Sequence, residues 1–256
     1  MFIIALNLMF AEYIRKNGTG SQLMKRNYFN IIFLGLVLIL CNLFSEKGIQ
    51  IIKGMSQVKP EQVTIVLDAG HGGFDPGKIG VNEVLEKDIN LSITYKLKGF
   101  LEQEGIKVIL TREDDNGLYK PGDWDKKRVD MSKRVAIINS SDALFAVSIH
   151  QNSFSQESSR GAQVFYHQNS VQGKILAETI QERVKQTMND GNHRLAKANG
   201  SYYMLRYTRC PLVIVECGFL SNWREAGLLS EDSYQEKIAQ AIHLGIIDYI
   251  NNLGIK

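Results

Sequence analysis

Short apolar runs alternate with longer amphipathic segments along most of the chain after Ser45. A continuous apolar run bounded by glycine or polar residues predicts a buried strand, whereas apolar residues spaced by four predict a helix. Ile89, Ile93 and Leu97 recur at that spacing, and Gly105 follows as a helix C-cap. The whole pattern predicts strands at 63–68, 107–111, 143–150, 161–166 and 211–218, and helices at 86–104, 132–139, 171–188 and 233–251.

This order of elements indicates a fold class. Strands that alternate with helices favour an α/β sandwich in which the strands are buried on both faces. About 210 residues follow the N-terminal region, which is enough for one well-buried domain. Residues 112–131 form the longest polar stretch, and we expect them to be a surface loop whose charges are solvated.

The N-terminal region contains a different hydrophobic pattern. Residues 31–41 are an uninterrupted run of apolar residues and glycine, preceded by Lys25 and Arg26. A positive segment before a short apolar stretch is typical of a secretory signal. The stretch is shorter than the roughly 18 residues of a confident transmembrane helix, and no small-x-small cleavage site follows it. A cleaved signal and an uncleaved membrane anchor therefore both remain open for residues 24–45.

These features divide the chain into segments. Met24 begins a natural-looking signal, so we interpret residues 1–23 as an over-extended translation start. Residues 46–62 are expected to be a linker, and residues 63–252 the catalytic domain. Because the positive end stays in the cytoplasm, the domain is expected to be exported, either secreted or held at the membrane by the N-terminal segment.

The distribution of charge argues against one class of protein, the nucleic-acid-binding domains. The chain has 30 Lys and Arg against 27 Asp and Glu, a formal net charge of +3. Residues 1–44 hold Arg15, Lys16, Lys25 and Arg26 against the single acid Glu12, so the remainder of the chain is neutral. A nucleic-acid-binding domain normally carries a basic excess in its body. We therefore expect no nucleic-acid partner.

Cys210 and Cys217 are not expected to form a disulfide with each other, and Cys217 is not expected to act in catalysis. Cys210 and Cys217 flank the predicted strand 211–218, which would hold them about 23 Å apart at 3.3 Å per residue. A disulfide needs Cα atoms within about 7 Å, so the two are not expected to pair. A cysteine in an apolar strand is usually inert, and we do not interpret Cys217 as a nucleophile.

Polar groups suited to metal chemistry follow three of the predicted strands. His71 follows the first strand, His150 ends the third, and Glu216 lies inside the last, which is otherwise apolar. Sites in open α/β sheets form beyond the carboxyl ends of strands. Glu86 and Glu83 both lie near the start of the first helix, at the same end of the sheet, and Glu86 has the alternative role of stabilising the helix dipole.

Two imidazoles and a carboxylate are a common catalytic zinc set, which leaves a fourth position for water. A further carboxylate that is not a ligand would take a proton from that water. Glu216 suits this role, because burial in an apolar strand should raise its pKa. His167, His193 and His243 lack such surroundings and are read as lying outside the site.

At these residues the sequence resembles the zinc-dependent N-acetylmuramoyl-L-alanine amidases of the bacterial cell wall, the amidase-3 family. The resemblance covers about residues 63–250, and five segments occur in the family's order. They are IVLDAGHGGFDPG (65–77), LEKDINL (85–91), ILTREDD (109–115), KRVAIINSSDALFAVSIHQNS (133–153) and PLVIVECGFLSN (211–222).

The resemblance implies one Zn²⁺ held by His71, Glu86 and His150, with Glu216 as the catalytic acid/base. It selects Glu86 over Glu83, because Glu86 occupies the motif's E-K-D-x-N-L position. It also implies a three-layer sandwich with a mixed, roughly six-stranded sheet. The implied reaction is hydrolysis of the amide between N-acetylmuramic acid and L-alanine in peptidoglycan. Gln151 departs from the small residue that often follows the second histidine.

Within the family, the chain is most similar to the small sporulation or germination type, above all in YYMLRYTRCPLVIVECGFLSN (202–222). That type implies a role in forming muramic-δ-lactam in the spore cortex, and it makes a regulatory protein partner plausible. Two alternatives remain. A metallo-exopeptidase would need a second metal, for which Asp68 and Asp75 are the nearby carboxylates, and a non-catalytic wall-binding domain would not need the complete set of four residues.

Overall fold

The computed structural model describes residues 63–254. The expected start, signal or anchor, and linker within residues 1–62 lie outside the described residues. Within 63–254, no helix is both long and apolar enough to cross a membrane.

The described part is built on one six-stranded sheet with the strand order β2-β1-β3-β6-β4-β5. Strand β4 runs antiparallel to β6, and the other neighbouring strands pair in parallel. The sheet is therefore mixed, as predicted. The strands are β1 (Thr64–Ala69), β2 (Lys107–Leu110), β3 (Phe145–Asn152), β4 (Gln163–His167), β5 (Lys197–Asn199) and β6 (Leu212–Phe219).

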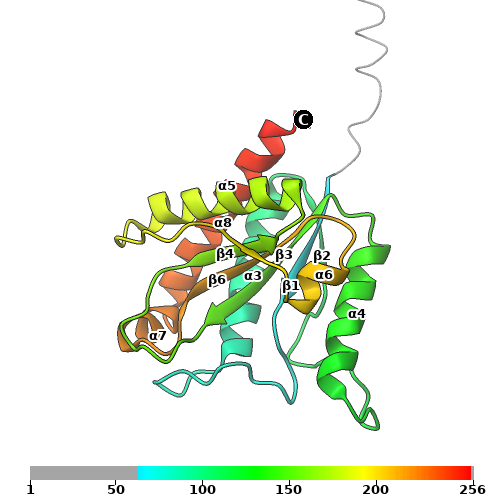
Figure 1. The fold of residues 1–256 in the computed structure, drawn as a ribbon, viewed down its shortest axis with the longest axis horizontal. Coiled ribbons are helices and arrows are strands. Elements are labelled where there is room, and N and C mark those ends of the chain that lie inside the picture. The colour runs from blue at the N-terminus through cyan, green and yellow to red at the C-terminus, as the bar shows by residue number, and fades with distance from the viewer. Residues whose placement is uncertain (1–62, 255–256) are drawn as a thin grey trace, which may run out of the picture. The chain divides into compact units, whose positions relative to one another are not determined.

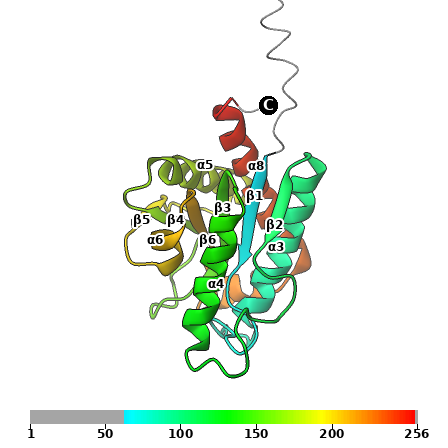
Figure 2. The same cartoon turned by 90° about the vertical axis from the view of Figure 1, so that its right-hand side faces the viewer.

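Helices cover both faces of this sheet, which makes three layers (Figures 1 and 2). The larger apolar core joins one face to α3 (Glu86–Gln103), α5 (Val171–Met188) and α8 (Asp232–Asn252). The smaller core joins the other face to α4 (Lys126–Ser140) and α6 (Tyr203–Tyr207). A further short helix, α7 (Trp223–Leu229), follows β6.

Alternation along the strands explains the two cores. In β1, Ile65 and Leu67 belong to the larger core and Val66 belongs to the smaller one, and all three are fully buried. Successive side chains of a strand point to opposite faces, so a strand covered on both sides must be apolar at nearly every position. This is why the strands appear in the sequence as continuous apolar runs.

The predicted start of the helix at 132–139 is wrong. The predicted helix 132–139 is in fact α4, which begins six residues earlier, at Lys126. The side chain of Asp125 accepts a hydrogen bond from the backbone N–H of Arg128 at 3.1 Å and caps the helix. The first two turns are mostly polar, so they carry no apolar repeat. The predicted surface loop 112–131 is correspondingly shorter.

The three strands that carry the candidate chemistry lie side by side. Strand β3 pairs in parallel with both β1 and β6, so their carboxyl ends meet at one edge of the sheet. In this register His150 is the direct neighbour of Glu216. Cys210, which precedes β6, and Cys217, which lies within it, form no disulfide with each other, as predicted.

Candidate functional site

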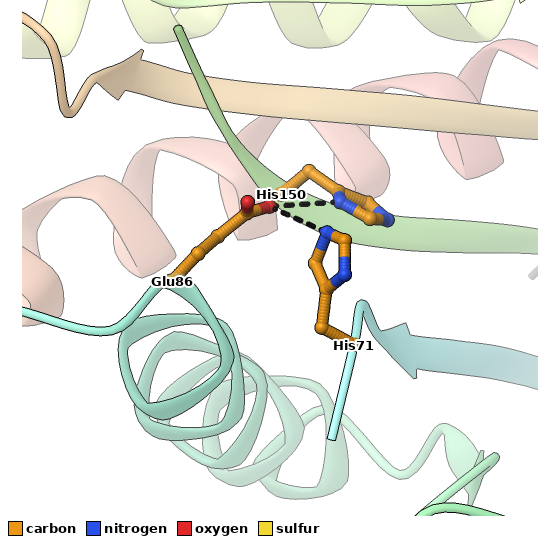
Figure 3. A group of neighbouring side chains, drawn as sticks. All are labelled: His71, Glu86 and His150. Carbon is orange, nitrogen blue, oxygen red and sulfur yellow. Dashed lines mark hydrogen bonds and ion pairs between the residues drawn. The ribbon is translucent and has the colours of Figure 1, made fainter. Parts of the chain in front are cut away.

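His71, Glu86 and His150 come together at the carboxyl edge of the sheet (Figure 3). His71 follows β1, Glu86 is the first residue of α3, and His150 lies in β3. One potential ligand atom from each residue lies within 4.8 Å of the other two. Glu83 is not part of this cluster, although it lies only three residues before Glu86.

The carboxylate of Glu86 lies between the two imidazoles. Its Oε1 is 3.0 Å from His150 Nδ1 and 3.2 Å from His71 Nε2. Backbone N–H groups of Gln151 and Lys78 donate to its two oxygens, at 3.0 and 2.8 Å. Burial alone would raise the pKa of Glu86, but the hydrogen bonds and charges of the two histidines hold it well below its ordinary value. Glu86 is therefore ionised at neutral pH.

Two glycines allow these side chains to approach so closely. A Cβ atom on Gly70 would lie 2.2 Å from the ring of His150. A Cβ atom on Gly77, whose φ is +68°, would lie 2.6 Å from Glu86 Oε2 and 2.7 Å from the ring of His71. The backbone thus forms a cradle that only glycine fits at these two places.

Asp75 orients the first imidazole. Its Oδ2 lies 3.0 Å from His71 Nδ1, and its Oδ1 accepts a hydrogen bond from the backbone N–H of Gly77 at 3.1 Å. When Nδ1 carries the proton, Nε2 is left as the free lone pair and faces the cluster. A carboxylate behind a histidine in this way fixes the tautomer that a metal ligand needs.

The loop that carries His71 is held by two buried arginines. Arg112 donates to the carbonyl oxygens of Ala69 (2.9 Å) and Gly70 (3.2 Å). Arg134 donates to those of Ala69 (2.6 Å) and His71 (2.5 Å). His71 has a φ of +64°, which is strained for a residue other than glycine. The two guanidinium groups stabilise this conformation.

Asp68 and Asp130 neutralise this pair of arginines. Arg134 Nη1 lies 2.8 Å from Asp68 Oδ1, and Arg134 Nε lies 2.5 Å from Asp130 Oδ2. Burial would raise the pKa of Asp68, but Arg134 and the hydroxyls of Ser148 and Thr111 lower it to about 2. The expectation that the charges of 112–131 are all solvated is therefore wrong, because Arg112 is only 4% exposed and Asp130 binds the buried Arg134.

Glu216 faces the same cluster from β6 but has few partners. Its Oε2 is buried and accepts no hydrogen bond from any residue in the described range. Burial, together with the negative charge of Glu86, raises its pKa to about 7, although the two histidines act in the opposite direction. Glu216 therefore has the property expected of a group that exchanges a proton near neutral pH.

A groove of about 430 Å³ opens over these side chains. Its floor includes Asp68, Glu86, His150 and Glu216, and its walls include Phe74 and Lys127 on one side and Tyr202 and Met204 from the segment around α6. The other potential nucleophile, Cys217, is fully buried, and burial raises the pKa of its thiol. Cys217 is therefore unsuited to nucleophilic catalysis, as predicted.

Neither carboxylate that a second metal would need is available. Asp68 is bound to Arg134, and Asp75 is bound to His71 and to Lys127, whose Nζ lies 3.3 Å from Asp75 Oδ2. Across residues 63–254, the cluster of metal-ligating atoms contains only His71, Glu86 and His150. His167, His193 and His243 are not part of it.

Sequence reasoning missed the residues that support the cluster. Asn90 donates to Gly70 O at 3.1 Å and to Glu86 Oε1 at 3.3 Å, and its own Oδ1 accepts from Gln151 Nε2 at 3.1 Å. Gln151, which departs from the small residue expected there, therefore extends this buried network. The available signal was position, since Asn90 lies one helical turn after Glu86 and on the same face.

Comparison with known protein families assigns this chain to one family. The family Amidase_3, described as N-acetylmuramoyl-L-alanine amidase, matches residues 65–248. A curated relative, the germination-specific N-acetylmuramoyl-L-alanine amidase of Bacillus subtilis (strain 168), is 36% identical over 193 residues, which are 74% of this chain and 81% of the relative.

Solved structures of amidases share the fold. The CwlD amidase of Clostridioides difficile, solved in complex with the GerS lipoprotein, has a TM-score of 0.73 at 44% identity, covering 75% of this chain and all of that one. The N-acetylmuramoyl-L-alanine amidase AmiC2 of Nostoc punctiforme has a TM-score of 0.64 at 32% identity, covering 74% of this chain and 97% of that one.

These matches span every strand that contributes to the groove. Amidases of this family are metal-dependent enzymes of the cell wall, so peptidoglycan is the substrate and the place of action is outside the cytoplasm. The chain belongs to the N-acetylmuramoyl-L-alanine amidase family Amidase_3 and is a hydrolase of the amide bond that joins the peptide to the glycan of peptidoglycan.

Proposed function

We propose that the groove holds one Zn²⁺ on His71, Glu86 and His150, and that Glu216 moves the proton in hydrolysis of the bond between N-acetylmuramic acid and L-alanine. The observation that carries this assignment is the contrast between two neighbouring carboxylates. Glu86 is an anion fixed by hydrogen bonds, whereas Glu216 lies beside the cluster with a pKa of about 7 and an oxygen that has no hydrogen-bond partner among residues 63–254.

The donor set fits zinc. Two imidazole nitrogens and one carboxylate oxygen lie within 4.8 Å of one another, in a cradle cleared of side chains by Gly70 and Gly77. Such a three-ligand set leaves a position for water or substrate. When bound, the ion would lower the pKa of a water and polarise the scissile carbonyl.

The residues of the chain supply the rest of the chemistry. A carboxylate oxygen of Glu216 accepts the proton released as water adds to the carbonyl carbon, and the same group then donates that proton to the departing nitrogen of L-alanine. In the metal-free protein burial raises the pKa of Glu216 to about 7, so its two protonation states lie close in free energy near neutral pH, which suits a group that takes up a proton and gives it back. Asp75 holds the tautomer of His71, while Asn90 and the backbone of Gln151 hold Glu86.

Two variants separate metal binding from proton transfer. Glu216→Ala is expected to keep its fold and metal content while losing most of its turnover, and His71→Ala is expected to lose the metal as well. Circular dichroism, metal analysis and release of peptide from peptidoglycan measure these three properties. Substantial turnover by purified Glu216→Ala would contradict the assignment of the acid/base.

The bond itself is identified by the products. We expect purified peptidoglycan, digested with and without a chelator, to yield glycan free of peptide and peptides with a free L-alanine amino terminus, and only without the chelator. Mass spectrometry distinguishes these from cleavage at D-amino-acid bonds, which would indicate a different peptidase. Two zinc ions per active chain would favour the metallo-exopeptidase instead.

We infer a role in the spore cortex, where removal of the peptide precedes formation of muramic-δ-lactam. The identity of 36% with the germination-specific amidase of Bacillus subtilis supports this role. Expression of this chain in a Bacillus subtilis strain that lacks its own enzyme should restore muramic-δ-lactam to the cortex. Failure of an active, exported chain to restore it would indicate a vegetative role.

We further propose that a lipoprotein regulates the enzyme, because the CwlD amidase was solved in complex with the GerS lipoprotein. Affinity purification of this chain from sporulating cells of its source, followed by mass spectrometry, should recover a lipoprotein. That lipoprotein, when purified, should change the activity of this chain. A lipoprotein without effect on activity would contradict the regulatory role.

For the remainder of the chain, we propose export through residues 24–45, a linker at 46–62 and a catalytic domain at 63–252, with translation starting at Met24. N-terminal sequencing of the native protein tests the start and the cleavage together. A peptide from residues 1–23 would refute the proposed start, and recovery in washed membranes would identify residues 24–45 as an anchor.

A further inference from the structure

One aromatic side chain that lines the groove is exposed beside the metal-ligating cluster, and a second exposed ring precedes α4. Phe74 lies in the loop between His71 and Asp75, lines the groove, and is 52% exposed. Trp124, in the turn before α4, is 93% exposed. The turn before α4 and the loop after β1 lie at the same end of the molecule in both views (Figures 1 and 2). An exposed aromatic ring that lines a groove is available to a ligand that fills the groove.

The ring of Phe74 packs against the ring of Tyr119. It meets the ring of Tyr119 edge to face, with centroids 4.9 Å apart and planes at 85°. The backbone N–H of Phe74 also donates to the hydroxyl of Tyr119 at 2.8 Å. Tyr119 fits only because Gly73 and Gly117 lack side chains, since a Cβ atom on either would lie within 2.3 Å of it. A ring that already packs against a neighbour loses less side-chain entropy when a ligand binds to it.

A lysine borders the two rings. Lys126 Nζ lies 5.7 Å from the ring centroid of Phe74 and 5.5 Å from that of Tyr119. In the part of the chain that the structure describes, Lys126 forms no ion pair. Its ammonium group therefore has N–H donors free for oxygen atoms of a ligand that rests on the rings.

An apolar ring face next to an unpaired ammonium group matches the chemistry of a sugar. A pyranose ring presents C–H groups on its faces and hydroxyl or N-acetyl oxygens around its edge. The first suit an aromatic ring and the second suit an ammonium donor. A stem peptide rich in carboxylates would instead favour ion pairs without the rings. The substrate is a polymer, so its glycan strand must extend beyond the muramic acid at the cluster.

We propose that Phe74, Tyr119 and Lys126 form a glycan subsite for a sugar next to the muramic acid that is cleaved, and that Trp124 extends this subsite along the strand. The inference rests on the amidase function and adds the part of the substrate that this wall of the groove binds. It makes the enzyme selective for muramic acid within a glycan strand over muramic acid in an isolated disaccharide.

The first test measures hydrolysis. Phe74→Ala and Trp124→Ala are compared with the unmodified chain on peptidoglycan strands of several disaccharides and on a single disaccharide-peptide. The ratio of kcat/KM for the long substrate to that for the short one should fall about tenfold in each variant. Trp223→Ala is the matched control, because Trp223 is also exposed (61%) but belongs to α7 and not to the segments that carry Phe74, Tyr119 and Trp124, and its ratio should be unchanged.

The second test measures binding without turnover. In a Glu216→Ala background, Phe74→Ala and Trp124→Ala should each weaken binding of peptide-free glycan strands about tenfold, while melting temperature and metal content stay the same. Unchanged glycan binding, or an equal loss of kcat/KM on long and short substrates, would overturn the proposal. Either result would point to the peptide or to a protein partner as the occupant of this wall.

The two hypotheses fail in different ways. If the unmodified chain releases no peptide from any substrate, the amidase function is wrong. If it is active but the length ratio does not change in the variants, only the glycan subsite is wrong.

Discussion

The surroundings of Glu86 and those of Glu216 differ sharply, although both carboxylates face the same groove. Glu86 lies at the start of a helix, between two imidazoles and two backbone N–H donors, and its pKa is held well below the ordinary value. Glu216 lies in the middle of an apolar strand, and its pKa is raised to about 7. The same residue type is thus ionised at neutral pH in one place, and in the other it has a pKa that suits the proton transfer proposed above.

Hydrogen-bond donors, more than burial, determine the difference in pKa between the two carboxylates. Burial raises the pKa of both groups. Only Glu86 has donors that offset this effect, and those donors come from backbone groups and histidines positioned by β1, β3 and α3. A strand such as β6 uses its own N–H groups in the sheet, so it has none to offer to Glu216.

The largest expected effect comes from exchanging each carboxylate for its amide. Glu86→Gln and Glu216→Gln should each lower turnover by about 10²–10⁴-fold. Only Glu86→Gln should also lose the metal, because Glu216 is not expected to be a ligand. Muropeptide release and metal analysis of the two proteins measure turnover and metal content. Equal metal loss in both variants would contradict the different roles assigned to Glu86 and Glu216.

Next in size is an effect of Glu216 on stability. Between pH 4.5 and about 7 the folded protein keeps a proton on Glu216 that the unfolded chain has released, so this group makes the fold less stable as pH rises through that range. Above pH 7, Glu216→Gln should therefore stabilise the metal-free protein by up to about 3 kcal/mol. Urea unfolding at pH 8 and at pH 4 measures this, and a gain that is the same at both pH values would contradict it.

Asp68 should show the opposite sign. Its folded-state pKa of about 2 lies below the ordinary value of 3.8, so its stabilisation is complete above pH 3.8 and is lost as pH falls through 2. The loss should amount to about 2 kcal/mol. Acid unfolding of Asp68→Asn, which should lack this component, provides the comparison. A mutant with the same acid dependence as the unmodified protein would exclude Asp68 as its source.

The smallest effect concerns the support of His71. Arg134→Lys keeps the charge but cannot reach Asp68, Ala69 and His71 together, so metal affinity should fall on the order of tenfold. Arg183→Lys is the matched control, because Arg183 pairs with Asp248 on the surface away from the groove. Competition with a fluorescent chelator measures both affinities. Equal affinity in the two variants would show that Arg134 does not support the site.

Much of this fold is predictable from local sequence. The long helix at 171–188 has the predicted bounds, and the buried strands agree within one or two residues, because an apolar run is a direct record of burial on both faces. Three short elements, β5, α6 and α7, were missed, since three to seven residues are too few to show a period.

Some residues of the candidate site were also predictable from the sequence, and others were not. His71, His150 and Glu216 stand out because each polar residue interrupts or ends an apolar strand. The roles of Arg112 and Arg134 could not be predicted from the sequence. A buried arginine differs from a solvated one only in its partners, and these are distant in sequence. Asp68 and the carbonyl groups of residues 69–71 are such partners.

The two arginines hold main-chain carbonyl oxygens, and this has a consequence for how the enzyme can change. A residue has the same carbonyl oxygen whatever side chain it carries. The hydrogen bonds from the two arginines to the loop after β1 therefore do not depend on the exposed residue at position 74. The side chain at position 74 can therefore change without changing the support of His71. The proposed glycan subsite is thus open to redesign at Phe74 while the positions of His71, Glu86 and His150 are kept.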